Sequence, residues 1–286
     1  MATQNQNVDG ERPASGTIVF AENDPILLDA IPELLKAKGY DVHCAEDGLE
    51  ALQAIRRLKP CVVILDIVMP KIDGSRVCWL VRQDPKLRNT PIIAFSALSP
   101  EQIGRFPELS ADAYVAKGPL QVVATNVLAA IKYVLARGRG DLEGGIFGYE
   151  GYQSRRLITE VLGFKRHWEA LVRIFQHGIL ALDEQGHVLL VNPVASRLFG
   201  KKETQIIGEP LPALVATADQ EAVRTALAAL TQAHVSEDRR VDLSLREQGA
   251  CLRLSNIIED GTCTGMLAII ESKSPSTKGS RGAQSP

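Results

Sequence analysis

The stretch CVVILDIVMPKIDG, residues 61–74, decides how this chain folds. It begins with a continuous run of apolar, mostly branched residues that ends at Asp66, and such a run is typical of a strand buried on both faces of a parallel sheet. A carboxylate at the end of a buried strand is costly unless a cation or a hydrogen-bond donor accompanies it. The stretch therefore predicts an α/β fold and a polar site at Asp66.

The same alternation of short apolar runs and amphipathic helices extends in both directions from this stretch. Because strands that alternate with helices form parallel sheets covered on both faces, we expect a doubly wound, five-stranded parallel sheet. The periodicity does not give the order of the strands in that sheet. Strands are expected at 17–21, 40–44, 61–66, 91–96 and 113–117, and helices at 26–35, 48–58, 75–83, 121–136 and, more weakly, 100–106.

Polar residues follow four of these strands at the carboxyl ends, where doubly wound sheets collect their binding groups. A second carboxylate near Asp66 would add like-charge repulsion, which a divalent cation and the Lys117 ammonium would offset. An oxygen-only cluster of this kind suits Mg²⁺. The residues are Glu22, Asn23 and Asp24 after the first strand, Asp66 after the third, Ser96 after the fourth and Lys117 after the fifth.

Four segments in this order resemble the receiver domain of two-component response regulators, the CheY-like family. They are ENDP at 22–25, LDIVMPKIDG at 65–74, SA at 96–97 and YVAK at 114–117, and the resemblance covers residues 16–137. It implies that the Asp66 carboxylate accepts a phosphoryl group from a histidine kinase or phosphotransfer protein. It also implies that Mg²⁺ is held by Glu22, Asn23, Asp66 and the backbone carbonyl of Val68.

The resemblance assigns three further roles. Lys117 would pair with a phosphate oxygen, the Ser96 hydroxyl would bind another, and Tyr114 would be the aromatic switch residue coupled to Ser96. Any enzymatic activity would be limited to self-catalysed phosphoryl acceptance and autophosphatase activity, because no separate catalytic output domain is recognisable in the sequence.

Two positions depart from the usual receiver pattern. Asn23 stands where a second carboxylate is usual, and since an amide oxygen carries no full charge we expect weaker metal binding. Gly118 stands between Lys117 and Pro119, where the proline usually follows the lysine directly. The pre-proline geometry that normally places the lysine is therefore not assured.

Four charged residues receive structural interpretations. Asp73 precedes a glycine and is expected to form a turn rather than bind a ligand. Asp112 is expected to lie in a solvated turn. Lys165 and Arg166 are expected on the solvated face of a connecting helix.

Residues 138–168 are expected to form a linker and a connecting helix. Within the predicted helix 153–176, six apolar residues are spaced by four, three, four, three and four positions, which is the spacing of a short coiled-coil seam. Either the seam pairs two chains or it packs on a neighbouring domain of its own chain, and both interpretations stay open. The residues are Leu157, Val161, Phe164, Trp168, Leu171 and Phe175.

Residues 169–272 resemble a PAS domain, through GILALD at 178–183, GHVLLVNPVASRLFG at 186–200 and ETQIIG at 203–208. The resemblance implies an α+β domain with an antiparallel sheet, whose ligand is unknown. His187 and His234 are expected to be solvated rather than to bind a cofactor. Asn192 is expected to be a turn or cap residue rather than a ligand contact.

Composition argues against nucleic-acid-binding, membrane-spanning and secreted proteins. The net charge of −2 argues against a broad nucleic-acid-binding face, and no apolar run approaches the roughly 20 residues that span a bilayer. The polar start lacks the apolar core of a secretion signal, so a cytoplasmic protein without a membrane span is expected. Residues 1–15 and 273–286 are expected to be disordered.

Three functional hypotheses follow. The first is a bacterial response regulator that is phosphorylated on Asp66 and relays the signal through protein contacts of its PAS domain, to a downstream protein or by self-association through the connecting helix. The second is a scaffold that works without phosphorylation, with Asn23 marking a decayed metal site. The third is a small-ligand sensor in which the PAS domain modulates the receiver.

Overall fold

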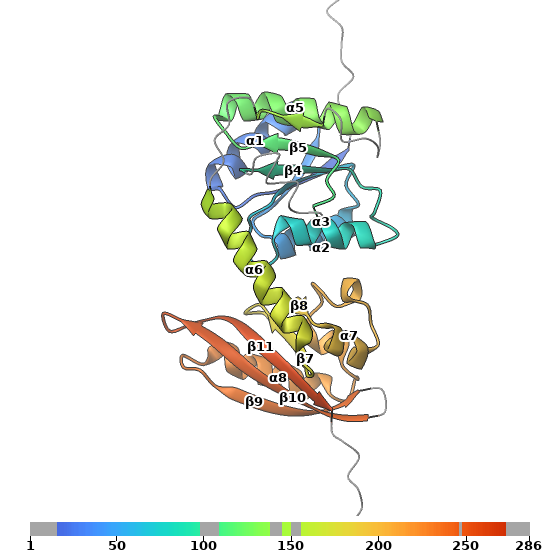
Figure 1. Ribbon diagram of the computed structural model, residues 1–286, viewed down its shortest axis with the longest axis vertical. Coiled ribbons are helices and arrows are strands. Elements are labelled where there is room, and N and C mark those ends of the chain that lie inside the picture. The colour runs from blue at the N-terminus through green and yellow to red at the C-terminus, as the bar shows by residue number, and fades with distance from the viewer. Residues whose placement is uncertain (1–15, 98–108, 138–144, 150–155, 246–247, 273–286) are drawn as a thin grey trace, which may run out of the picture. The chain divides into compact units, whose positions relative to one another are not determined.

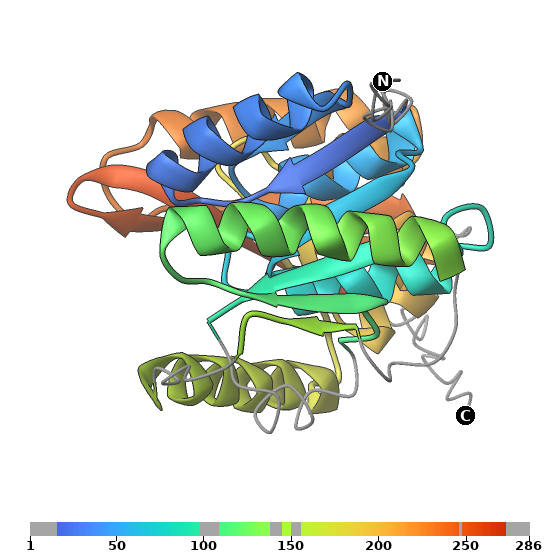
Figure 2. The same cartoon turned by 90° about the horizontal axis from the view of Figure 1, so that it is seen from above.

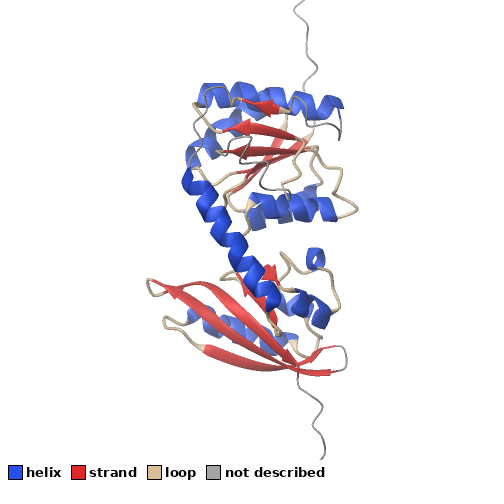
Figure 3. Cartoon of the chain, viewed as in Figure 1, coloured by secondary structure: helices blue, strands red, loops and turns tan. Residues whose placement is uncertain are grey.

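The computed structural model describes residues 16–97, 109–137, 145–149, 156–245 and 248–272. The chain divides into two compact units, with the boundary between Lys165 and Arg166. Helices alternate with strands in the first unit, and long strands dominate the second (Figure 3). The predicted disorder at 1–15 and 273–286 and the weak helix at 100–106 lie outside the described residues. The predicted domain limits stay a prediction.

The first unit contains a parallel sheet whose strands lie in the order β2-β1-β3-β4-β5-β6. The two strands that carry most of the chemistry, β1 and β3, are direct neighbours in this order. This arrangement confirms the predicted doubly wound α/β fold. The strands are β1 (Thr17–Ala21), β2 (Asp41–Ala45), β3 (Val62–Asp66), β4 (Ile92–Ser96), β5 (Ala113–Ala116) and β6 (Ile146–Phe147).

The sheet has a sixth strand beyond the five that the sequence predicts. β6 pairs in parallel with β5 and comes from the segment predicted as a linker. Tyr114 of β5 donates its backbone N–H to the carbonyl of Gly145 just before β6. The open backbone groups of an edge strand attract such an addition. A strand of two residues is too short to show the pattern of apolar residues by which a strand is recognised in a sequence.

Helices cover both faces of this sheet (Figures 1 and 2). The helices α1 (Pro25–Ala37) and α5 (Leu120–Arg137) lie on one face, and α2 (Gly48–Leu58) and α3 (Gly74–Gln83) lie on the other. Three of them begin at an aspartate that accepts a backbone N–H of the first turn, namely Asp24, Asp47 and Asp73. Such caps satisfy backbone donors that the helix itself leaves free.

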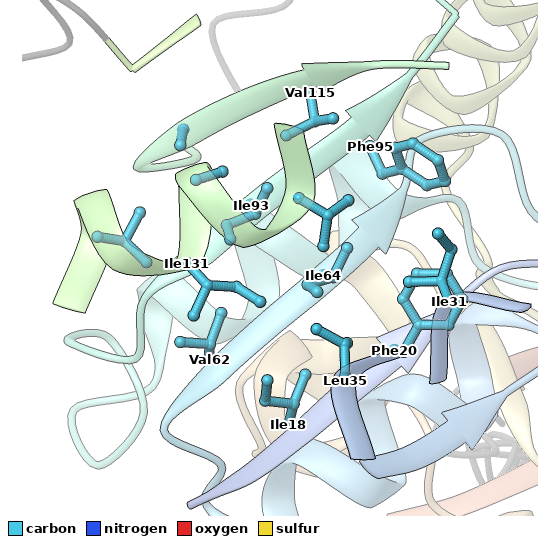
Figure 4. Close-up of a cluster of buried hydrophobic side chains, with 14 of the residues drawn as sticks. Ile18, Phe20, Ile31, Leu35, Val62, Ile64, Ile93, Phe95, Val115 and Ile131 are labelled. Atoms are coloured by element: carbon cyan, nitrogen blue, oxygen red, sulfur yellow. The ribbon is translucent and has the colours of Figure 1, made fainter. Parts of the chain in front are cut away.

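A core of branched and aromatic side chains lies between the sheet and the pair α1 and α5 (Figure 4). Phe20, Ile64 and Phe95 reach it from β1, β3 and β4, and Ile31 and Ile131 reach it from the two helices; all five are fully buried. Because this core fixes the three strands side by side, it also fixes the polar residues that follow them.

The second unit is built on an antiparallel sheet in the order β8-β7-β11-β10-β9. On β9, Leu243 and Leu245 are buried while Ser244 between them is exposed, a pattern typical of an antiparallel strand with one face toward water. The fold class is thereby confirmed for this half as well. The strands are β7 (Gly178–Leu182), β8 (Val188–Val191), β9 (Asp238–Leu245), β10 (Gln248–Glu259) and β11 (Thr262–Ser272).

Helical segments connect the two outer parts of this sheet. α7 (Pro193–Phe199) ends at Gly200, which takes the left-handed conformation that favours glycine, and α8 (Gln220–Gln232) packs on β9, β10 and β11. Two short 3₁₀ helices, η1 (Glu203–Gln205) and η2 (Leu211–Leu214), lie between them. The helix α6 (Arg156–Ile174) contains the boundary between the two units.

Candidate functional site

Two buried carboxylates meet at the carboxyl edge of the first sheet. Asp66 is the last residue of β3 and Glu22 directly follows β1, and their exposed fractions are 3% and 0%. Since β1 and β3 are neighbours in the sheet, the two side chains share one small region. Two like charges buried side by side require a counter-charge.

Lys117 provides that counter-charge from the end of β5. Its Nζ lies 2.8 Å from Asp66 Oδ2 and 2.8 Å from Glu22 Oε2, and it donates to Glu22 Oε1 at 2.9 Å. The ammonium also lies 5.2 Å from the centre of the Phe95 ring, which forms one side of the site. Lys117 therefore reaches both carboxylates although Gly118, rather than proline, follows it.

The oxygen atoms of the two carboxylates differ in how well they are satisfied. Glu22 Oε1 accepts the backbone N–H groups of Asn23 and Asp24 as well as Lys117. Asp66 Oδ1 accepts the Val68 N–H at 3.2 Å. Glu22 Oε2 is buried and lies 2.8 Å from the Lys117 ammonium, but it accepts no hydrogen bond from the residues that the structure describes. The site therefore holds oxygen ligands with unused capacity.

The protonation of Asp66 reflects this environment. Burial is the largest influence and raises the pKa of Asp66 to about 6, with the nearby Glu22 carboxylate also raising it and the Lys117 ammonium opposing both. Burial disfavours the charged form of a carboxylate, and a nearby cation stabilises that form. A buried acid with such a shifted pKa is therefore a candidate for a chemical role.

The residues present fit a hard divalent cation. Carboxylate oxygens are the ligands that Mg²⁺ prefers, and the unsatisfied Oε2 of Glu22 is one of them. Within the described ranges, no group of three or more His, Cys, Asp or Glu residues is placed to hold a metal. The acidic part of the site is thus the pair Glu22 and Asp66, with Asn23 where a third acid would stand.

The neighbouring residues of the acidic turn separate into two roles. Asn23 is exposed beside Glu22. Asp24 does not turn toward the site, because its carboxylate caps α1 by accepting the N–H of Ile26 at 2.9 Å. Of the two acidic side chains in this turn, Asp24 therefore caps the helix and Glu22 faces the site.

Ser96 and Tyr114 lie on the fourth and fifth strands of the parallel sheet, as the sequence predicts. Ser96 ends β4, directly after the residue that pairs with Asp66, and is 1% exposed. Tyr114 lies on β5, where its buried hydroxyl donates to the Leu109 carbonyl at 2.8 Å. Burial, the largest influence, raises the pKa of Tyr114 to about 12. The switch roles of both residues stay predictions.

Asp73 caps a helix instead of forming the predicted turn, and it has a partner that the sequence did not reveal. It caps α3 through the Arg76 N–H and accepts the Ser75 hydroxyl. The ammonium of Lys165 on α6 also binds it. Burial favours a higher pKa for Asp73, but Lys165 and these donors outweigh it and lower the pKa. The prediction that Lys165 is simply solvated is therefore wrong.

The prediction of a solvated turn at Asp112 is also wrong. Its carboxylate binds the Arg82 guanidinium at 2.7 Å and accepts the Ile92 N–H at 2.7 Å. Arg82 in turn donates to the carbonyls of Arg88, Thr90 and Ser110. A contact across thirty residues leaves no local sequence signal, so only the folded chain shows this clamp.

In the second unit the polar residues singled out by the sequence have structural partners. Asn192 is 1% exposed and caps α7, as predicted. The His187 ring lies 3.2 Å from the buried Asp183 carboxylate, so it is less solvated than predicted. His234 is exposed and lies 3.2 Å from the Gly261 carbonyl.

Family models match most of the described chain. Residues 18–126 match the response regulator receiver domain, and residues 166–262 match the PAS fold. These two matches show that the chain carries a receiver domain of the two-component response regulators followed by a PAS domain, which confirms both resemblances. In the described ranges, no helix has the length and apolar character to cross a membrane.

One curated relative is a DNA-binding dual master transcriptional regulator from Synechocystis sp., 32% identical over 122 residues. The match covers 42% of this chain, and the chain spans about half (49%) of that relative.

Similar solved structures match the chain over the length of one domain. A response regulator from Chloroflexus aurantiacus is 31% identical, and a sensor histidine kinase receiver domain from Pseudomonas aeruginosa with a magnesium ion in its active-site cleft is 22% identical. Each covers 43% of this chain and 99–100% of its own, with TM-scores of 0.39 and 0.40.

Proposed function

We propose that this protein is a phosphorylated response regulator whose phosphoacceptor is Asp66. The observation that carries the proposal is the buried Asp66 carboxylate held between Glu22 and the Lys117 ammonium at the carboxyl edge of the sheet. A structural ion pair would need one acid for one base, whereas here two buried acids share one lysine. The surplus acid supports a chemical role.

The proposed reaction transfers a phosphoryl group from a phosphohistidine of a kinase or phosphotransfer protein. An Asp66 oxygen attacks phosphorus, an O–P bond forms, and the N–P bond breaks. The electron pair of the broken N–P bond returns to the imidazole, which then takes up a proton. Lys117, already 2.8 Å from Asp66 Oδ2, is within reach of a phosphoryl oxygen on that atom, and Ser96 would hydrogen-bond a second oxygen.

A divalent cation is part of this proposal. Glu22, Asp66, the Asn23 amide and the Val68 carbonyl would hold Mg²⁺, which would supply positive charge against the transferring group. The unsatisfied Glu22 Oε2 supports this assignment. Since the proposed site has one carboxylate fewer than is usual, we expect half-maximal phosphorylation to require a higher Mg²⁺ concentration than in the Asn23→Asp variant.

The output is proposed to be a protein contact. The change at Asp66 would pass through Ser96 and Tyr114 to α6 and the PAS domain, which binds a downstream protein or a second chain. A nucleic-acid partner is not part of the proposal, and the PAS ligand stays unknown.

Labelling with a small phosphodonor tests the phosphoacceptor. With acetyl phosphate and Mg²⁺, wild type is expected to shift on a phosphate-affinity gel, and Asp66→Asn is expected to lose the shift, because the amide cannot form the acyl phosphate. Asp29→Asn, at an exposed aspartate of α1, is the matched control and should label as wild type does.

The same experiment separates the alternatives. Absence of labelling in wild type at saturating Mg²⁺ would favour the scaffold that works without phosphorylation. Equal labelling of wild type and Asp66→Asn would place the phosphoacceptor elsewhere. A chromophore that copurifies with the full chain would favour the sensor hypothesis.

A further inference from the structure

The loop between β3 and α3, residues 67–73, is closed at the backbone of Asp66. The N–H of Gly74, the first residue of α3, donates to the Ile67 carbonyl at 3.0 Å. A Cβ added at Gly74 would lie only 2.0 Å from the carbonyl oxygen of Asp66, closer than two atoms can approach. The start of α3 therefore rests directly on Asp66, and a shift of one residue moves the other.

The middle of this loop is fixed to α2. The Lys71 ammonium lies 3.1 Å from Asp47 Oδ2, and the Gly48 N–H donates to the Pro70 carbonyl at 3.3 Å. Because these contacts hold the middle in place, a change at Asp66 is taken up at the two ends of the loop. Asp73 is the residue at the far end.

Both oxygens of the Asp73 carboxylate are engaged. Oδ1 accepts the Ser75 hydroxyl and the Arg76 N–H, while Oδ2 binds the ammonium of Lys165. The exposed fraction of Asp73 is 6%, and a charge buried to this extent requires a counter-charge. Lys165 lies on α6 and belongs to the first unit, as Asp73 does. The buried carboxylate thereby ties the early part of α6 to the end of the loop.

The early part of α6 has little helical stability of its own. Gly163 lies within the helix, where a glycine costs about 1 kcal/mol relative to alanine. A Cβ added there would meet no described atom within 4 Å, so packing does not require this glycine. The first turn also holds no acidic residue that would favour the helix dipole. These turns therefore depend on contacts such as that of Lys165 with Asp73.

The conformation of the loop depends on the charge of Asp66. The Val68 N–H donates to Asp66 Oδ1 at 3.2 Å, and a charged acceptor binds such a donor more strongly than a neutral one. Conversion of the carboxylate into an acyl phosphate moves its charge to the phosphoryl oxygens. The loop then loses the acceptor that holds its first residues, and Asp73 at its other end is expected to shift.

We infer that Lys165 is a positioning residue for the β3–α3 loop. Through Asp73 it holds the loop in the form that favours the unmodified Asp66 carboxylate, and phosphorylation weakens the Asp73–Lys165 contact and loosens the early part of α6. The inference rests on the proposed function and adds a route from Asp66 to α6 besides Ser96 and Tyr114. Because such coupling is reciprocal, loss of the contact must favour binding of a phosphoryl group at Asp66.

Hydrogen exchange of the full chain over residues 156–165 tests this route. With acetyl phosphate and Mg²⁺, wild type is expected to exchange about fivefold faster there than without phosphodonor. Lys165→Met should exchange fast in both conditions. Arg173→Met removes the same charge from an exposed position of α6 and is the matched control, which should behave as wild type does.

A binding measurement tests the reciprocal effect, which a merely structural role of Lys165 would not produce. Beryllium fluoride with Mg²⁺ serves as a non-covalent mimic of the phosphoryl group, and Trp79 fluorescence reports its binding. Lys165→Met is expected to bind it about fivefold more tightly than wild type or Arg173→Met. Asp73→Asn keeps an oxygen for the Arg76 N–H and should match Lys165→Met, and the double variant should show no further change.

The outcomes separate this inference from the proposed function. Labelled wild type whose exchange over 156–165 stays unchanged would overturn the inference alone, as would Lys165→Met that binds beryllium fluoride no more tightly than Arg173→Met. A wild type that neither labels nor binds the mimic would instead overturn the proposed function, and the inference with it.

Discussion

Both units bury polar side chains almost completely, but they differ in how many hydrogen bonds these side chains form. In the receiver, Glu22 and Asp66 are buried acids that share one lysine, and Glu22 Oε2 accepts no hydrogen bond from the described part of the chain. In the PAS domain, Asn192 and Asn256 are buried neutral amides that are bonded to backbone groups on both the oxygen and the nitrogen.

The bonds of Asn192 show what the second arrangement achieves. Its oxygen accepts the N–H groups of Ile179 and Ala195, and its nitrogen donates to the carbonyls of Val172 and His177. One side chain thereby joins β7, the start of α7 and the end of α6. A fully satisfied buried amide holds a fold together, whereas an unsatisfied buried acid has capacity left for a ligand or a reaction.

Removing the counter-charge of the receiver site should give the largest effect on stability. Lys117→Met leaves Glu22 and Asp66 buried together without a cation. We expect the free energy of unfolding to fall by about 3 kcal/mol at neutral pH. Urea unfolding, combined with hydrogen exchange that resolves the two units, measures this loss and should place it in the receiver.

A double variant shows whether the loss comes from charge. Lys117→Met combined with Asp66→Asn removes one acid along with the base and should recover most of the stability. If the double variant is as unstable as Lys117→Met, the lysine stabilises by packing on Phe95 rather than by charge, and the contrast between the units would fail.

Removing the amide of Asn192 should give a smaller but still large effect. Asn192→Ala leaves two buried N–H groups and two carbonyls without their partner, which we expect to cost about 2–3 kcal/mol in the PAS unit. Labelling of Asp66 should be unchanged. Asn23→Ala is the matched control at an exposed asparagine and should shift stability by no more than ~0.5 kcal/mol. Equal effects of the two alanine variants would contradict the structural role of Asn192.

The smallest effect is expected at Asn23 itself. Asn23→Asp adds the carboxylate that the acidic turn lacks and should tighten Mg²⁺ binding about tenfold, or ~1.4 kcal/mol. Titration of the Trp79 fluorescence with Mg²⁺ measures the affinity. Asn89→Asp adds the same charge at another exposed asparagine and should change little. Equal affinity of wild type and Asn23→Asp would show that this position does not face the metal.

Much of the receiver was predictable from the sequence because its signals are local. The run of apolar residues before Asp66 and the helical periodicities gave five strands and four of the helices with only small errors in their limits. The acidic turn and Lys117 were recognisable because parallel strands bring their carboxyl ends together. Asn192 was likewise predicted to be a turn or cap residue, the kind of role in which a short amide side chain is common.

Other features had no local signal. β6 is two residues long, and the Arg82 clamp on Asp112 joins residues thirty positions apart. Lys165 was predicted to be solvated because a lysine on an amphipathic helix usually is, and only the fold brings Asp73 to it. In each case the deciding partner is distant in the chain, so no window of sequence contains both residues.

The sequence by itself determined the two fold classes, the gathering of Glu22, Asp66 and Lys117, and the seam spacing along α6, because periodicity and strand ends are properties of neighbouring residues. Only the tertiary structure decided the strand order, the contacts of the two Glu22 oxygens and the four bonds of Asn192. These depend on burial and on distances between remote residues, which exist only once the chain has packed.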